Sequence, residues 1–313
     1  MMEKLVIALG GNALQSRTSA PTAQGQLEVV GRTCETLAAI SQQGYEMAIV
    51  HGNGPQVGRL VLALETAANQ VPPLPFDACG AMTQGYIGYH IQQCLQRELA
   101  KQGRAVPVVT LTTQVVVDRE DPAFREPTKP IGPFYSHAQA LIYEKDKGYT
   151  MIEDAGRGWR RVVASPAPKR IVELETVKRL WDSTIVITCG GGGVPVAENP
   201  DGSLEGVEAV IDKDLAAGLL AEQMEADVLL ILTEVEKVAI RFGQPDQQDL
   251  DRLTLEEARQ YAEAGEFGKG SMLPKVRAAV DFAASKPGRK AIITSLSKAL
   301  DALEGRTGTL ITA

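Results

Sequence analysis

The stretch Leu5-Val6-Ile7-Ala8-Leu9-Gly10-Gly11-Asn12 joins a short apolar run to a pair of glycines. Consecutive apolar residues that end at a turn signal are typical of a strand buried on both faces. The pattern returns twice, where residues 47–50 lead into His51-Gly52-Asn53-Gly54 and residues 185–189 lead into four glycines, 190–193. Such strands, alternating with helical stretches, predict a mostly parallel sheet with helices on both faces.

The rest of the chain continues this α/β pattern. We expect further strands over residues 106–117, 228–232, 291–294 and 309–311, and helices over residues 24–43, 55–68, 81–101, 173–181, 213–224 and 270–285. Thr254-Leu255-Glu256-Glu257 has the form of a capping box and predicts one more helix start. Because no flexible linker separates two halves, we expect a single domain over 1–313, with two lobes, 1–210 and 211–313, that share one sheet.

Residues 118–168 interrupt the pattern, and we call them the protruding segment. They contain several prolines, which resist helix interiors and central strands: Pro122, Pro127, Pro130, Pro133, Pro166 and Pro168. Long irregular segments in compact enzymes are often lids or binding flaps. We therefore expect a departure from the main sheet, with short strands such as residues 160–163.

The composition excludes some classes of protein. The chain has 313 residues, of which 44% are hydrophobic, and its formal net charge is −7. An acidic balance argues against a general binder of nucleic acid or anionic membranes. Its four cysteines form no CxxC pair and its three histidines complete no zinc spacing, so we expect buried free thiols and no bound metal. No apolar run reaches the about 18 residues of a membrane helix, and no signal peptide is recognisable, so we expect a cytoplasmic protein.

The three glycine-rich turns are candidate phosphate-binding sites. In a parallel sheet they emerge at the same carboxyl edge, where ligands of such folds bind. Glycine lets the backbone approach a ligand closely, and a helix N-terminus behind the turn favours an anion. The sequence has no Walker A motif, no strict G-x-G-x-x-G and no protein-kinase triplets. Phosphoryl transfer nevertheless needs little beyond positioning and charge stabilisation.

Three lysines are candidates for that charge. Lys129 lies between two prolines, while Lys213 and Lys275 lie at predicted helix starts. A single lysine is usually a solvated surface charge, but these placements are unusual for one. Asp214 either orients the lysines or caps a helix. His51 borders a glycine turn, and we favour a structural role because an anionic acceptor needs no general base.

Three arginines form a basic group on the protruding segment. Arg157, Arg160 and Arg161 lie within five consecutive residues. Either they gather anions or they form a solvated face, and the sequence does not separate these two interpretations.

Taken together, the motifs resemble the amino-acid-kinase superfamily, and within it most closely the carbamate kinases. The resemblance covers essentially the whole chain. Its motifs follow one another in the order 8–13, 51–58, 82–89, 127–132, 153–160, 189–195, 210–214 and 270–275. Other members of the superfamily, such as acetylglutamate kinase, carry a lysine two residues before the first glycine pair. Here that position is Ala8, and Lys129 is the natural replacement, as in carbamate kinases.

The resemblance implies a three-layer α/β/α sandwich on an eight-stranded, mostly parallel sheet, with a protruding subdomain over 118–168 that closes over the site. It implies a homodimer and an enzyme that interconverts ATP and carbamate, formed from ammonia and bicarbonate, with ADP and carbamoyl phosphate. In cells this reaction commonly runs toward ATP, at the end of arginine or purine-derived catabolism. The lobe 1–210 resembles the carbamate side and 211–313 the nucleotide side, with Mg²⁺ carried on the nucleotide phosphates.

The expected mechanism is direct in-line transfer. The backbone turns that would hold carbamate and the transferred phosphoryl group are Gly10, Gly11, Asn12, Gly52, Asn53 and Gly54. The residues that would neutralise developing charge are Lys129, Lys213 and Lys275, with Asp214 fixing the lysines. The glycines that would line the cleft are Gly190, Gly191, Gly192 and Gly193. The nucleotide would contact Lys213, Asp214, Thr233, Met272, Leu273, Pro274 and Lys275.

Two alternatives remain. The first is a kinase of the same fold that acts on an acyl carboxylate or a nucleoside monophosphate. Ala8 and the Pro127-Thr128-Lys129-Pro130 segment speak against it. The second is a ligand-binding regulator that has lost catalysis, and the retained lysines and glycine turns speak against that.

Overall fold

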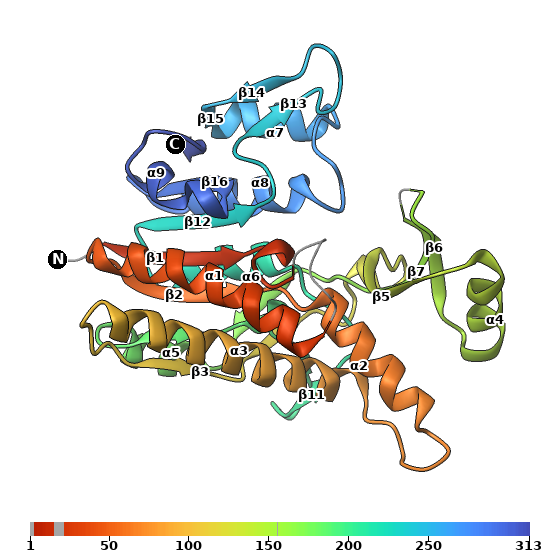
Figure 1. Ribbon diagram of the computed structural model, residues 1–313. Helices are drawn as coiled ribbons and strands as arrows, with labels where there is room; N and C mark the ends of the chain where they lie inside the picture. Colours follow the sequence, from red (N-terminus) through yellow and green to blue (C-terminus); the bar gives the residue numbers. More distant parts are fainter. Residues whose placement is uncertain (1–2, 16–21, 155) are drawn as a thin grey trace.

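The computed structural model describes residues 3–15, 22–154 and 156–313. Within these residues, eight strands form one continuous sheet in the order β15-β17-β16-β12-β1-β2-β9-β3 (Figure 1). Every neighbouring pair from β16 to β3 is parallel, whereas β17 runs antiparallel to β16 and parallel to β15. The strands are β1 (Lys4–Leu9), β2 (Glu46–His51), β3 (Val108–Thr110), β9 (Ile185–Ile187), β12 (Val228–Thr233), β15 (Arg252–Thr254), β16 (Lys290–Ser295) and β17 (Thr309–Thr312). The predicted α/β class is confirmed.

Helices cover both faces of this sheet. One face packs against α1 (Ala23–Gln42), α3 (Phe76–Lys101) and α9 (Ala299–Leu303). The other face packs against α5 (Leu174–Trp181), α6 (Lys213–Gln223), α7 (Leu255–Glu263) and α8 (Met272–Ala284). The Thr254 side chain caps α7 in the predicted capping box.

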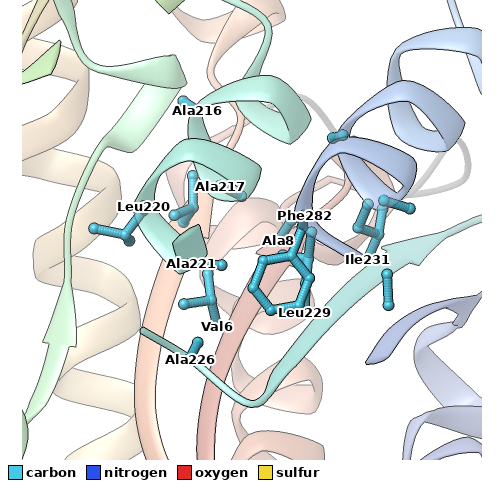
Figure 2. Close-up of a cluster of buried hydrophobic side chains, with 14 of the residues drawn as sticks. Val6, Ala8, Ala216, Ala217, Leu220, Ala221, Ala226, Leu229, Ile231 and Phe282 are labelled. Carbon is cyan, nitrogen blue, oxygen red and sulfur yellow. The ribbon is translucent and has the colours of Figure 1, made fainter. Parts of the chain in front are cut away.

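The alternation of side chains along β1 explains why its residues 5–9 are all apolar. Leu5, Ile7 and Leu9 enter the core beneath α1 and α3. Val6 and Ala8 enter the opposite core, where Figure 2 shows them beside side chains of α6 and the ring of Phe282 from α8. Burying a ring of this kind contributes about 2–3 kcal/mol. A strand covered on both faces has no position left for a polar residue.

The expected single strand over residues 106–117 is wrong. The chain forms two strands in two different sheets: β3 in the main sheet and β4 (Gln114–Val117) in a second, four-stranded sheet. Between them, the amide side chain of Gln84 bonds both the N–H and the C=O of Thr113. The C=O of Thr113 also accepts from the N–H of Val194 at 2.8 Å. Because of these contacts, Thr113 does not pair with a strand of the main sheet, and the chain passes from that sheet to the second one.

The second sheet has the order β11-β10-β4-β8. Its other strands are β8 (Pro168–Ile171), β10 (Val194–Glu198) and β11 (Leu204–Gly206), and β13 (Val238–Ile240) and β14 (Gln248–Leu250) form a separate hairpin. The four cysteines are buried and free, as predicted. In the part of the chain that the structure describes, no helix combines the length and apolar character that crossing a bilayer would require.

The protruding segment leaves the main body, as Figure 1 shows at its right side. It forms the three-stranded sheet β5-β7-β6, with β5 (Lys129–Tyr135), β6 (Thr150–Glu153) and β7 (Trp159–Val163). It also contains a helix that the proline count did not suggest, α4 (His137–Lys147). Ser136 and Gln139 form a capping box at its start, and Gly148 ends it with φ 66°.

Candidate active site

The glycine turns meet at one edge of the main sheet because the strands before them are in register. Leu9 lies opposite both His51 and Leu232, so β1, β2 and β12 end side by side. The turn at Gly10 follows β1 directly, and the turn at Gly52 follows β2. Asn53 then precedes α2 (Gly54–Thr66), which has a proline in its first turn. The edge therefore carries two glycine turns and a helix N-terminus.

Close approaches explain two of these glycines. A Cβ atom at Gly10 would lie 2.7 Å from the carbonyl oxygen of Leu232, and one at Gly52 would lie 3.2 Å from Cδ of Lys213. The stem of Lys213 therefore lies across the second turn. Gly11 and Asn12 are exposed, and the space beside the Gly11 Cα is open. These two residues are accessible to a ligand.

Two aspartates bring the three predicted lysines together. Lys129 Nζ on β5 donates to Asp212 Oδ2 at 2.5 Å. Lys213 Nζ and Lys275 Nζ donate to the two oxygens of Asp214, at 2.6 Å and 2.8 Å. Asp212 in turn caps α6, because its Oδ1 accepts from the N–H of Asp214 at 2.9 Å. Residues from three separate parts of the chain thus form one charged cluster beside the second glycine turn.

The ionisation of this cluster follows from burial and pairing. Burial favours the neutral form of Asp212, but Lys129 and Lys213 outweigh it and hold the pKa of this carboxyl well below its usual range. Burial lowers the pKa of Lys213 against the opposing attraction of Asp214. At Lys275 burial acts in the same direction, but Asp214 outweighs it and the pKa is raised. Three ammonium groups face two carboxylates, so the cluster can accept further negative charge.

The sequence interpretation did not single out Asp212, although it is the partner of Lys129. The available signal was its position directly before the α6 residues, where an aspartate is a preferred N-cap. Nothing local to Asp212 indicated that Lys129 would reach it from the protruding segment.

The four glycines 190–193 are buried, and each faces another part of the protein. A Cβ atom would lie 2.5 Å from His51 Nε2 at Gly190, 2.3 Å from Asn53 Nδ2 at Gly191 and 2.2 Å from the Ile211 carbonyl oxygen at Gly192. Gly191 to Gly193 also have positive φ angles, between 69° and 93°. Packing against the second turn and the start of α6 therefore accounts for the run. That it also lines the substrate cleft stays a prediction.

His51 and Asn53 lie beneath the second turn. His51 is 1% exposed, and burial lowers its pKa to about 4, against a smaller opposing effect of its contact with the Gly52 carbonyl. Asn53 donates from Nδ2 to Thr83 Oγ1 at 2.8 Å, and its Oδ1 has no hydrogen-bond partner among the described residues. A neutral, buried His51 agrees with the structural role that we favoured.

The residues predicted to contact the nucleotide lie further along the same edge. Thr233 ends β12 opposite Ser295. Met272, Leu273 and Pro274 form the first turn of α8 and are half-buried, and Lys275 directly follows them. This turn brings apolar surface next to the ammonium group that Asp214 holds. Their contact with a nucleotide stays a prediction.

The comparison with known proteins identifies the family. The sequence profile of the Amino acid kinase family matches residues 3–295. The chain belongs to this family. Within the family it is 54% identical to the carbamate kinase of Clostridium perfringens, over 98% of this chain and 99% of that protein. It is 52% identical to the carbamate kinase-like protein YqeA of Escherichia coli, over 99% of each chain.

Solved structures of the family agree with the fold. Carbamate kinase from Giardia lamblia bound to citric acid superposes with a TM-score of 0.94 at 40% identity, over 99% of this chain and 98% of that chain. The same protein bound to AMP-PNP gives a TM-score of 0.91 at 41% identity, with the same coverage. The predicted family resemblance and fold class are confirmed.

Proposed function

We propose that the chain catalyses reversible phosphoryl transfer between ATP and carbamate, giving ADP and carbamoyl phosphate. The observation that carries this proposal is the cluster of Lys129, Lys213 and Lys275 on two aspartates, directly beside the glycine turns. Full-length similarity to carbamate kinases supports the same reaction. The similar AMP-PNP complex supports an adenine nucleotide as substrate.

We infer a role for each part of the site. The amides of Gly10 to Asn12 and of Gly52 to Gly54 hold carbamate and the transferred group at the edge of the sheet. The transferred phosphoryl group passes in line between the carbamate oxygen and the β-phosphate oxygen of ADP, with its charge spread over the equatorial oxygens. Lys129 approaches that charge from the protruding segment, while Lys213 and Lys275 approach it from α6 and α8. Asp214 holds the last two lysines at one position.

The two lobes divide the substrates. Residues 1–210, including the protruding segment, hold carbamate or carbamoyl phosphate, and residues 211–313 hold the nucleotide against Thr233 and the first turn of α8. Strands of the first lobe and of the second occupy opposite halves of the main sheet and meet where β1 pairs with β12, which supports this division. The protruding segment closes over the bound substrates.

Magnesium enters with the nucleotide. Within residues 3–15, 22–154 and 156–313, no group of three or more His, Cys, Asp or Glu side chains could hold a metal ion. Asp212 and Asp214 are already bonded to lysines. This arrangement fits a Mg²⁺ ion bound mainly by nucleotide phosphates and water, as is common in kinases. The ion supplies further neutralisation of phosphate charge.

The family resemblance also supports a cytoplasmic homodimer that produces ATP during arginine or purine-derived catabolism. Size-exclusion chromatography with light scattering would test the dimer, and a mass of about one chain would contradict it.

A coupled assay tests the reaction itself. ADP, Mg²⁺ and carbamoyl phosphate should yield ATP, detected with hexokinase and glucose-6-phosphate dehydrogenase. Acetylglutamate with ATP, and UMP with ATP, serve as parallel substrates for the nearest alternative. Turnover with one of these and none with carbamoyl phosphate would contradict the proposal.

A further inference from the structure

The arginines of the protruding segment are not a free basic patch. Arg157 and Arg160 both pair with Asp154, at 2.8 Å and 3.4 Å, and both lie over the ring of Phe134. Arg161 differs from them because its ion-pair partners lie outside the protruding segment. It pairs with Glu65 of α2 and with Glu208, which precedes α6.

Arg161 is the centre of a compact junction. Its side chain is only 11% exposed, and its guanidinium lies 3.6 Å from the ring centre of Tyr149, the residue directly before β6. One terminal nitrogen bonds Glu208, and the other lies 3.8 Å from Glu65. Lys147 of α4 also pairs with Glu65. A planar guanidinium can stack flat on a ring while the nitrogens of its fixed fork reach two carboxylates, whereas an ammonium group has neither the flat face nor the fork.

The same two strands carry Arg161 and Lys129. On the antiparallel pair β5 and β7, Ile131 lies opposite Arg161 and Lys129 lies opposite Val163. The segment that carries Glu208 also carries Asp212, the partner of Lys129. A β-bridge between Ala164 and Ala209 joins these two parts of the chain. Arg161 and Lys129 therefore connect the same small sheet to the same segment, at two nearby points.

The third contact of Arg161 reaches the helix that begins at the second glycine turn. Glu65 lies near the end of α2, and close to the start of that helix a Cβ atom at Gly58 would lie 2.1 Å from Gly132 Cα on β5. Backbone contact at Gly58 sets the separation of α2 and β5. Val57 of α2 and Ile131 of β5 pack in a small apolar cluster beside this contact, and the ion pairs of Arg161 add a directional restraint on the lateral position of the two elements.

We propose that Arg161 is a positioning residue, which sets the location of the Lys129 ammonium group relative to Asp212 and the transferred phosphoryl group. The inference rests on the proposed function, since Lys129 acts in that reaction. Arg161 itself touches no reacting atom. It acts by holding the β5–β7 pair against α2 and against the segment 208–212.

The test compares Arg161→Gln with a matched variant in the ADP and carbamoyl phosphate assay. Because small misplacements of a catalytic group are costly, we expect kcat to fall about ten- to a hundredfold with the KM for ADP unchanged. Arg161→Lys, which keeps the charge but not the planar fork, should recover part of the loss. The control is Arg170→Gln, which removes a half-exposed pair with Glu198 and should leave kcat unchanged.

A double-mutant cycle separates positioning from a general structural role. In a Lys129→Ala background, Arg161→Gln should lower kcat no further, because the group it positions is gone. Equal fold-losses in both backgrounds, or an unchanged kcat in the single variant, would overturn the inference. If the wild-type chain has no activity with carbamoyl phosphate, the proposed function fails first, which is a distinct result.

A second variant guards against misfolding of Arg161→Gln. Glu208 is mostly exposed and Glu65 still faces the buried guanidinium, so Glu208→Gln weakens the junction without leaving Arg161 unpaired. We expect a smaller loss of kcat in the same direction, again absent in the Lys129→Ala background. A loss of equal size in that background would overturn the inference.

Discussion

The site has two layers that differ in charge and in exposure. The charged layer consists of Lys129, Asp212, Lys213, Asp214 and Lys275, and the neutral floor consists of His51, Asn53 and Gly190 to Gly193. Residues of the charged layer have partners that an incoming phosphate can replace. Residues of the floor have close contacts that no ligand can replace. Changes at the outer lysines should therefore alter the reaction, and changes in the floor should alter stability.

Lys129→Ala should have the largest effect on the reaction. The Lys129 side chain is 27% exposed, so its removal takes away little buried contact surface. Removing one group that stabilises transition-state charge costs about a hundred- to a thousandfold in kcat. We expect a loss of that order with a modest change in the KM for ADP, and a lower melting temperature because the buried carboxylate of Asp212 loses its bonded cation. Lys178→Ala, at a surface pair with Glu175, is the control. A lower melting temperature with an unchanged kcat would show that Lys129, like the residues of the neutral floor, supports stability and not the reaction.

Gly191→Ala should have the largest effect on stability. Its φ of 69° is strained for alanine, and the new Cβ would lie 2.3 Å from Asn53 Nδ2. Strain and overpacking together should cost about 3–4 kcal/mol of unfolding free energy, measured by urea denaturation. Gly11→Ala is the control, because the space beside Gly11 is open. Equal stability of the two variants would contradict a supporting role for the 190–193 run.

His51 should make stability depend on pH. Burial lowers its pKa to about 4 in the folded chain, below the usual histidine value of 6.5. Between these two values the unfolded chain binds a proton that the folded chain does not, so stability is full above pH 6.5 and falls as the pH drops toward 4. The loss amounts to about 3 kcal/mol at most. Urea denaturation at several pH values in this range should show that the unfolding free energy of His51→Gln depends less steeply on pH than that of the wild-type chain. If the unfolding free energies of the two proteins change equally with pH, His51 is not the group that causes the pH dependence.

Lys275→Ala should have the smallest effect of the four and act mainly on the nucleotide. Lys213 still pairs with Asp214 in this variant, so that carboxylate keeps a partner. Loss of one charge-assisted contact to phosphate should raise the KM for ADP about tenfold. Initial rates at varied ADP measure this, with Lys298→Ala at an exposed pair with Asp301 as the control. A normal KM for ADP with a raised KM for carbamoyl phosphate would reverse the proposed assignment of the lobes.

Much of the fold could be predicted because its signals are local. The apolar runs of β1, β2 and β12 and the capping box of α7 each lie within a few consecutive residues. The division of residues 106–117 between two sheets could not be predicted, because Gln84 of α3 causes it. The helix α4 was missed although Ser136, Gln139 and Gly148 mark both its ends. The surrounding prolines argued against a helix in this segment, and the capping residues were therefore given too little weight.

The site divides in the same way. The convergence of Lys213 and Lys275 could be anticipated because both begin helices at the carboxyl edge of a parallel sheet. The partner of Lys129 could not, because the contact joins residues 83 positions apart. The tight packing of Gly190 to Gly192 likewise depends on His51, Asn53 and Ile211, all distant in sequence. The sequence shows where a glycine run lies, but it does not show which distant residues pack so closely that only glycine fits.

Asp212 assigns separate tasks to its two carboxylate oxygens. Oδ1 accepts from the N–H of Asp214 in the first turn of α6 and so caps the helix, and Oδ2 accepts from the ammonium group of Lys129. An asparagine could perform the first task and not the second, because its other terminal atom is a hydrogen-bond donor without negative charge. A single exchange of oxygen for nitrogen can therefore leave the helix start intact while removing the ion pair that holds Lys129, one of several ion pairs that attach the protruding segment. At this residue, architecture and reactivity can be altered independently.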